Sequence, residues 1–158
     1  MTGVQTCALP ISWVRASNPS AVELQSFANA QGQSWVEFLA TRVGQWADKP
    51  ELLGRSGYSC VGAVVGAAAD TALTARLRSL MPRSLFLVPG FGAQGAGPAE
   101  IKPCFNPDGK GAIVNSSRGI LYAFNTPQYA DRFPNQWEKC VEQACRDFLA
   151  DLRNAIAG

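Results

Sequence analysis

A glycine-rich segment, residues 89–97, could bind an anion through its backbone. It holds four glycines, Gly92 and Gly95 among them, and it follows an apolar run directly. Glycines let backbone N–H groups approach a ligand closely and form a concave array of donors that suits phosphate oxygens. Gln94 is the side chain here that could add a hydrogen bond at some reach. The spacing is not that of the dinucleotide-binding fingerprint, so a phosphate cradle and a flexible connection both remain possible.

Arg118 is a second candidate for anion binding. It stands in the polar segment 115–119, directly after the last apolar run, with Gly119 behind it. A guanidinium in this position can hold a phosphate through two parallel hydrogen bonds. For an arginine considered alone, a surface salt bridge is the alternative.

The positions of these two segments along the chain join them into one hypothesis. In (β/α)₈ barrels, the phosphate site is typically built from the loops after strands 7 and 8. The glycine-rich segment and Arg118 follow the last two apolar runs of this chain. We therefore expect both on the same rim of such a barrel.

Short apolar runs predict the strands, and amphipathic patterns predict the helices between them. Residues 61–66 are apolar or glycine without alternation, which is typical of a strand buried on both faces. Ser20 with Glu23, and Ser34 with Glu37, have the spacing of helix capping boxes. The predicted strands are 13–16, 60–66, 85–88 and 112–115, and the predicted helices begin at Ser20, Ser34, Asp70 and Asn135, the first ending near Asn29.

This alternation of strands and helices predicts an α/β fold with a parallel sheet. A doubly wound sheet and part of a (β/α)₈ TIM barrel are the two possible closures. A full barrel needs roughly 250 residues, so the 158 residues here would supply about the last four βα units.

The composition excludes several classes of function. Hydrophobic residues make up 47% and charged residues 16% of the chain, and the net charge is +2. No stretch concentrates Lys and Arg, so neither a nucleic acid nor a membrane surface is expected as a partner. Histidine is absent, which removes Ser–His and Cys–His catalysis and most zinc chemistry, and we expect no metal site. The five cysteines form no C-x-x-C pair and are expected to be reduced thiols in a cytoplasmic protein.

The first twelve residues differ from the rest of the chain. They show neither a helical nor a strand period, and they resemble a translated sequencing-adapter stretch. The hypothesis is that residues 1–12 are not native and that the domain comprises residues 13–158, beginning inside a strand.

Four segments together resemble one enzyme family. Residues 88–95 (VPGFGAQG) and 112–123 (AIVNSSRGILYA) are similar to orotidine 5′-phosphate decarboxylases of the bacterial subgroup with longer chains. Residues 14–21 (VRASNPSA) and 61–67 (VGAVVGA) resemble the fifth and sixth strands of that subgroup. The segments occur in the family's order, so the resemblance implies the C-terminal half of its barrel.

The resemblance also implies a reaction and a set of contacts. The family, whose members are carboxy-lyases, converts orotidine 5′-monophosphate to uridine 5′-monophosphate in de novo pyrimidine biosynthesis, without a metal or organic cofactor. Its members are usually homodimers. By resemblance, Gln94 and Arg118 would bind the 5′-phosphate of this small-molecule substrate with the backbone at Gly92, Gly95 and Gly119, and Ser17 would bind the pyrimidine base.

The family's catalytic Asp/Lys cluster has no counterpart in this chain, so no catalytic residue is predicted here. Asp48–Lys49, which precedes a proline, is expected in a solvated loop. The sequence therefore predicts that the chain alone is inactive. Another phosphate-binding (β/α)₈ enzyme, or a non-catalytic half-barrel that binds phosphorylated ligands, is the alternative.

Overall fold

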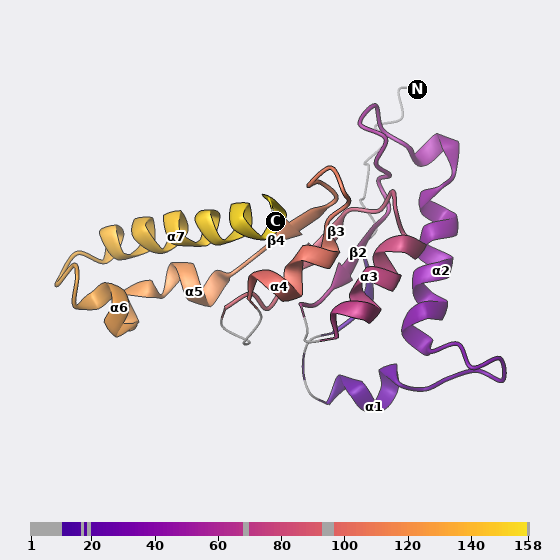
Figure 1. The fold of residues 1–158 in the computed structure, drawn as a ribbon, viewed down its shortest axis with the longest axis horizontal. Coiled ribbons are helices and arrows are strands. Elements are labelled where there is room, and N and C mark those ends of the chain that lie inside the picture. Colours follow the sequence, from indigo (N-terminus) through magenta and orange to yellow (C-terminus); the bar gives the residue numbers. More distant parts are fainter. Residues whose placement is uncertain (1–10, 17, 19, 68–69, 93–96, 158) are drawn as a thin grey trace, which may run out of the picture.

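The computed structural model describes residues 11–16, 18, 20–67, 70–92 and 97–157. Four parallel strands form one sheet in the order β1-β2-β3-β4 (Figure 1). Their bounds are Ile11–Arg15, Gly62–Val65, Phe86–Val88 and Ala112–Val114. The predicted parallel α/β architecture is confirmed.

The helices follow the strands in the expected alternation. The first three are α1 (Ala21–Gln25), α2 (Trp35–Ala47) and α3 (Thr71–Leu80). After β3 come α4 (Pro98–Ile101), α5 (Ser117–Leu121), α6 (Pro127–Ala130) and α7 (Trp137–Ala157). Single 3₁₀ turns occupy Pro50–Leu52, Lys102–Cys104 and Ala123–Asn125.

Two of the four predicted N-caps, Ser34 and Asp70, are confirmed by side-chain hydrogen bonds. Ser34 and Glu37 form the reciprocal capping box of α2, and the Asp70 carboxylate accepts from the Leu73 N–H at 2.9 Å. Ser20 makes no such bond, because its hydroxyl accepts from the Asn18 amide instead.

The predicted helix from Ser20 to Asn29 is too long. It ends at Gln25 because the Asn29 side chain holds a tight turn, accepting from the backbone N–H groups of Gln31 and Gln33. The last helix begins at Trp137, one residue later than a cap at Asn135 predicts, since Asn135 adopts a left-handed φ of 58°.

The sheet has one face covered by helices and one open face. Ala63, Val65, Phe86 and Val88 face the helices and are fully buried. The strand register aligns Trp13, Val64, Leu87 and Ile113 as one apolar row on the open face.

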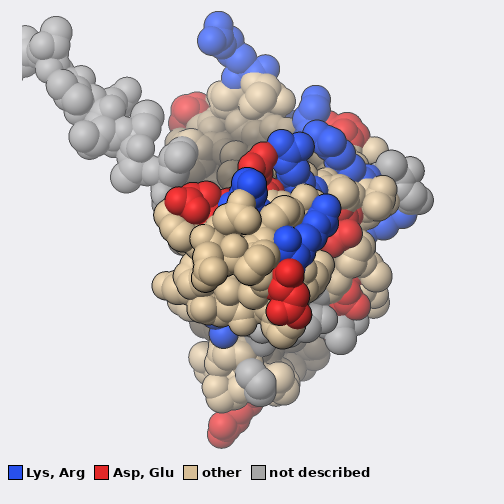
Figure 2. All heavy atoms as spheres, turned by 90° about the vertical axis from the view of Figure 1, so that its left-hand side faces the viewer, with Lys and Arg blue, Asp and Glu red and all other residues tan. Residues whose placement is uncertain are grey.

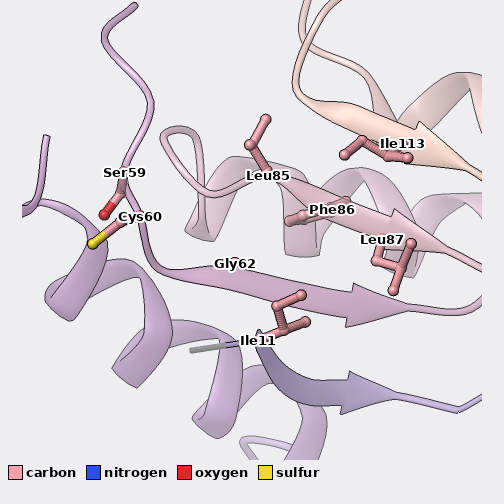
Figure 3. Close-up of a pocket in the computed structure, with 8 residues that line it drawn as sticks. All are labelled: Ile11, Ser59, Cys60, Gly62, Leu85, Phe86, Leu87 and Ile113. Atoms are coloured by element: carbon pink, nitrogen blue, oxygen red, sulfur yellow. The ribbon is translucent and has the colours of Figure 1, made fainter. Parts of the chain in front are cut away.

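Trp13 and Ile113 are exposed by 68% and 57%, which is unusual for large apolar side chains. Beside this row lies an apolar cavity of about 120 Å³, lined from all four strands (Figure 3). A closed barrel would bury this open face as its interior.

Arg78 of α3 fastens the helix to the starts of two strands. Its guanidinium is buried and donates to the carbonyls of Met81, Ser84, Cys104 and Gly111. It also lies 3.7 Å from the ring centroid of Phe86. Burial lowers the pKa of Arg78 to about 10, against the opposing effects of Tyr58 and Cys104, so the group keeps its charge at neutral pH.

The segment from α5 to the first half of α7 extends beyond the sheet as an arm (Figure 1). The arm has a small core of its own, in which Ala123, Cys140 and Ala144 pack with Tyr129 and Phe133. The second half of α7 packs on the main core through Phe148, Leu152 and Ala155. A single helix therefore joins two apolar cores.

Among the described residues, every helix is too short or too polar to cross a membrane.

Replacing Arg78 with leucine should lower the free energy of unfolding by about 3 kcal/mol, because several buried carbonyls lose their donor. Arg76→Leu is the matched control on the same helix. The Arg76 side chain is 61% exposed, and its Nε lies 3.7 Å from the Glu37 carboxylate, so its loss should cost less than about 1 kcal/mol. Urea unfolding measures both variants, and equal losses would contradict the fastening role of Arg78.

Cys104 should resist alkylation in the folded chain. Its side chain is fully buried, and this burial raises the pKa of the thiol to about 12, despite the opposing charges of Arg78 and Arg15. Cys60 and Cys145 are partly exposed and should react first. Iodoacetamide labelling with mass spectrometry checks this, and labelling of Cys104 before unfolding would contradict it.

Candidate functional site

The ends of β3 and β4 bring the two candidate anion-binding segments together. The strands pair with Val88 opposite Val114, and the Asn115 N–H continues the ladder by donating to the Val88 carbonyl at 3.2 Å. Because the strands are parallel, both following segments leave the sheet at the same edge. A cavity of about 170 Å³ lies between them, lined by Pro89, Gly90, Phe91, Asn115, Ser116, Ser117 and Arg118.

Arg118 supplies a positive charge to this cavity. It is the second residue of α5 and is exposed. In the part of the chain that the structure describes, the arginines in ion pairs are Arg76, Arg83 and Arg146. The guanidinium of Arg118 thus lies at the cavity with no carboxylate from the described residues to neutralise it.

The glycine-rich segment begins with a strained backbone that only glycine adopts readily. Gly90 and Gly92 have φ values of 102° and 72°. Between them, the carbonyl of Phe91 accepts a hydrogen bond of 3.0 Å from the Ser116 hydroxyl. The first part of the cradle is therefore held against the segment that carries Arg118.

The structure brings together three of the predicted site residues. Gly92, Arg118 and Gly119 all adjoin Ser116 or its cavity: a Cβ at Gly92 would lie 3.7 Å from the Ser116 hydroxyl oxygen, and one at Gly119 would lie 2.6 Å from it. Ser17, Gln94 and Gly95 lie outside the described residues.

Arg15 organises the neighbouring part of the same rim, after β1 and β2. A β-bulge between Trp13 and Arg15 places Arg15 opposite Val65, whose side chain faces the helices. The buried guanidinium then donates to the Thr74 hydroxyl at 2.8 Å and to the Asp70 carbonyl at 3.2 Å. Burial lowers the pKa of Arg15, and the charge of Asp70 opposes this effect.

Sequence reasoning missed Ser116 and Arg15 as organising residues. Ser116 belongs to the polar segment after the last strand, but spacing alone does not tell which of its two serines turns inward. Arg15 lies in a strand, where regular alternation would turn its side chain to the same face as Trp13. The β-bulge turns the side chain toward the helices instead.

The Asp48–Lys49 dipeptide lies in an exposed turn, as the sequence predicted. Asp48 ends α2 and pairs with Arg83 at 3.6 Å, and both side chains are at least half exposed. Among the described residues, no group of three or more Cys, Asp or Glu side chains could hold a metal ion.

Charges of both signs are mixed over the surface that the arm presents. Figure 2 shows lysines and arginines next to aspartates and glutamates on this face, with broad uncharged areas between them. Within α7, Arg146 pairs with Glu142 at 2.6 Å.

Comparison with known sequences gives one consistent family of relatives. No family model matches the chain. The orotidine 5′-phosphate decarboxylase of Caldicellulosiruptor bescii is 39% identical over 144 residues, which are 91% of this chain and 44% of that protein. The chain thus spans less than half the length of the curated relatives it matches.

Solved structures agree with the sequence comparison. A Toxoplasma gondii protein assigned as an orotidine-monophosphate decarboxylase superposes with a TM-score of 0.62 and 27% identity, over 87% of this chain and 51% of that one. Leishmania donovani UMP synthase gives a TM-score of 0.60 and 29% identity, over 91% of this chain and 27% of that one.

These structural relatives have TIM-barrel folds, of which the four parallel strands form a part. In sequence and in fold, the chain is similar over most of its own length to one part of the orotidine 5′-phosphate decarboxylases.

Proposed function

We propose that this chain contributes the substrate-phosphate end of a carboxy-lyase that converts orotidine 5′-monophosphate to uridine 5′-monophosphate. The observation that carries the proposal is the cavity between the ends of β3 and β4, with Arg118 at its wall. A phosphate monoester needs donors and positive charge at one place, and this rim offers both. The homology to orotidine 5′-phosphate decarboxylases supports this assignment.

In this proposal Arg118 binds the 5′-phosphate through a charge-assisted pair of hydrogen bonds. Gln94 adds a side-chain donor, and the backbone at Gly92, Gly95 and Gly119 lies close to the phosphate oxygens. Ser17, which follows β1, binds the pyrimidine ring at the neighbouring part of the rim. No metal or organic cofactor takes part.

The reacting carboxylate must lie away from these contacts, because the phosphate and the base occupy opposite ends of the nucleotide. Binding energy from the remote phosphate can then offset the desolvation and positioning of the reacting group. We infer that the proton-donating lysine and its aspartates come from strands other than β1–β4, since Asp48 and Lys49 lie in an exposed turn. The chain alone is therefore expected to bind nucleotide without turning it over.

The open face of the sheet supports the inference that the catalytic residues come from other strands. The apolar side chains of Trp13, Val64, Leu87 and Ile113 lie on the face of the sheet that a closed barrel would enclose as its interior. We propose that residues 13–158 form the C-terminal half of that barrel and that four further strands cover the row. Residues 1–12 are proposed to be non-native sequence, of which Ile11 and Ser12 extend β1 by pairing with Gly62 and Ala63. The complete enzyme would be a cytoplasmic homodimer.

Mixing the chain with the complementary N-terminal half of the Caldicellulosiruptor bescii enzyme should restore decarboxylation, while either half alone should be inactive. Loss of the orotidine 5′-monophosphate absorbance measures the activity. Replacing Trp13 with aspartate should abolish complementation, since the charge would be buried in the barrel interior. Turnover by the chain alone, or no turnover by the mixed halves, would contradict the proposed half-barrel.

Replacing Arg118 with alanine should weaken binding of uridine 5′-monophosphate to the chain roughly ten- to a hundred-fold, since a hydrogen-bonded ionic contact is lost. Arg42→Ala on α2 is the matched control, because Arg42 is also exposed but lies on the β1–β2 side of the sheet. Isothermal titration calorimetry measures both. Uridine, which lacks the phosphate, should bind both variants equally, and equal losses for the monophosphate would argue against an Arg118 phosphate site.

A further inference from the structure

Ser116 links the two segments that form the proposed phosphate site. Its hydroxyl lies between β3 and β4 ends and donates to the Phe91 carbonyl at 3.0 Å. Ser116 and Phe91 are exposed by only 9% and 7%. A hydrogen bond this well shielded competes little with water and holds its two segments at a fixed separation.

The strands themselves do not fix this separation. The β3–β4 ladder ends where the Asn115 N–H meets the Val88 carbonyl, and the neighbouring Pro89 has no N–H to extend it. Beyond that point, the bond from Ser116 to Phe91 is a direct polar link between the glycine-rich segment and the segment of Arg118. The Phe91 ring also packs edge-on against Phe148 of α7, with centroids 5.1 Å apart, so this link reaches the main core.

Ser116 does not cap α5 with its side chain, although its position at the N-cap would predict this role. Ser116 precedes α5 at the N-cap, where a serine hydroxyl usually accepts a hydrogen bond from the first turn of the helix. Here the side chain makes no capping bond and turns to Phe91 instead. The choice of serine at this position is thus explained by the bond across the site and not by the helix.

Gly119 provides the space that this hydroxyl needs. A Cβ at position 119 would lie 2.6 Å from the Ser116 oxygen, which is closer than real contacts allow, but 3.9 Å from the Ser116 Cβ. A methyl group at position 119 therefore conflicts with the hydroxyl alone. Ser116 and Gly119 act as one unit.

We propose that Ser116 is a positioning residue for phosphate recognition: it sets the distance between the glycine-rich segment and Arg118, and Gly119 is required to let it do so. The inference rests on the proposed nucleotide site but concerns a residue that need not touch the nucleotide. It predicts coupling between positions 116 and 119, which a purely structural serine would not show.

The test compares Ser116→Ala, Gly119→Ala and the double variant in the full chain, by calorimetric titration with uridine 5′-monophosphate and with uridine. Each single variant should bind the monophosphate roughly tenfold more weakly, the effect of one lost positioning hydrogen bond, and should bind uridine as the parent chain does. The double variant should bind about as weakly as Ser116→Ala, because the alanine methyl no longer meets a hydroxyl. Additive losses would refute the coupling.

Ser59→Ala is the matched control for lost stability. Ser59 is also a buried serine, whose oxygen accepts from the Val61 N–H at 3.1 Å, but it lies at the opposite end of the strands. Urea unfolding should rank it with Ser116→Ala, while its monophosphate affinity stays that of the parent. If Ser116→Ala does not fold, Gly119→Ala still tests the proposal, since it displaces the hydroxyl without removing it.

The outcomes separate this inference from the proposed function. If the parent chain binds the monophosphate, Arg118→Ala loses it and Ser116→Ala does not, the nucleotide site stands and the positioning role is refuted. If the parent chain shows no preference for the monophosphate over uridine, both are refuted.

Discussion

The parallel pairing of β3 with β4 is the constraint on which the candidate site depends. Val88 and Val114 end the two strands side by side, so the segments that follow meet at one edge of the sheet. An antiparallel partner would have sent them to opposite edges. The buried guanidinium of Arg78 supports the pairing from the other end, where its contacts reach the carbonyls of Ser84 and Gly111 at the starts of these strands.

Buried polar groups connect the segments that carry the chemistry. Arg15 joins the end of β1 to the start of α3, and Arg78 joins the end of α3 to β3 and β4. Ser116 joins the two sides of the cavity between the ends of β3 and β4. Such groups are costly to bury unless their hydrogen bonds are made. Each of these hydrogen bonds forms only when its two segments lie in one relative position, and apolar packing alone specifies that position less strictly.

Much of the architecture could be predicted from the sequence because it follows from local patterns. The apolar run before Gly66 and the capping residues Ser34 and Asp70 carry their own signal. The first helix was predicted too long because its end depends on the Asn29 side chain turning back on its own loop. The spacing of Ser20 and Glu23 also predicted a helix cap that is not formed, because the Ser20 hydroxyl accepts a hydrogen bond from the Asn18 side-chain amide instead.

The candidate site was predictable only in part. Gly92, Arg118 and Gly119 follow strands directly, so chain order placed them at one rim. The role of Ser116 depends on which neighbour its hydroxyl meets in space, and that of Arg15 on a one-residue bulge. Neither feature changes the periodic pattern of apolar residues in the sequence, because each concerns the direction of a single side chain.

The long helix α7 connects the arm to the sheet edge where β3 and β4 end. Its 21 residues span about 30 Å, and Cys140 in the arm's core lies about 22 Å along the helix from Ala155 in the main core. Phe148, between these ends, touches the Phe91 ring. Phe91 also lines the cavity between the ends of β3 and β4, so one helix packs both in the core of the arm and against a wall of this cavity.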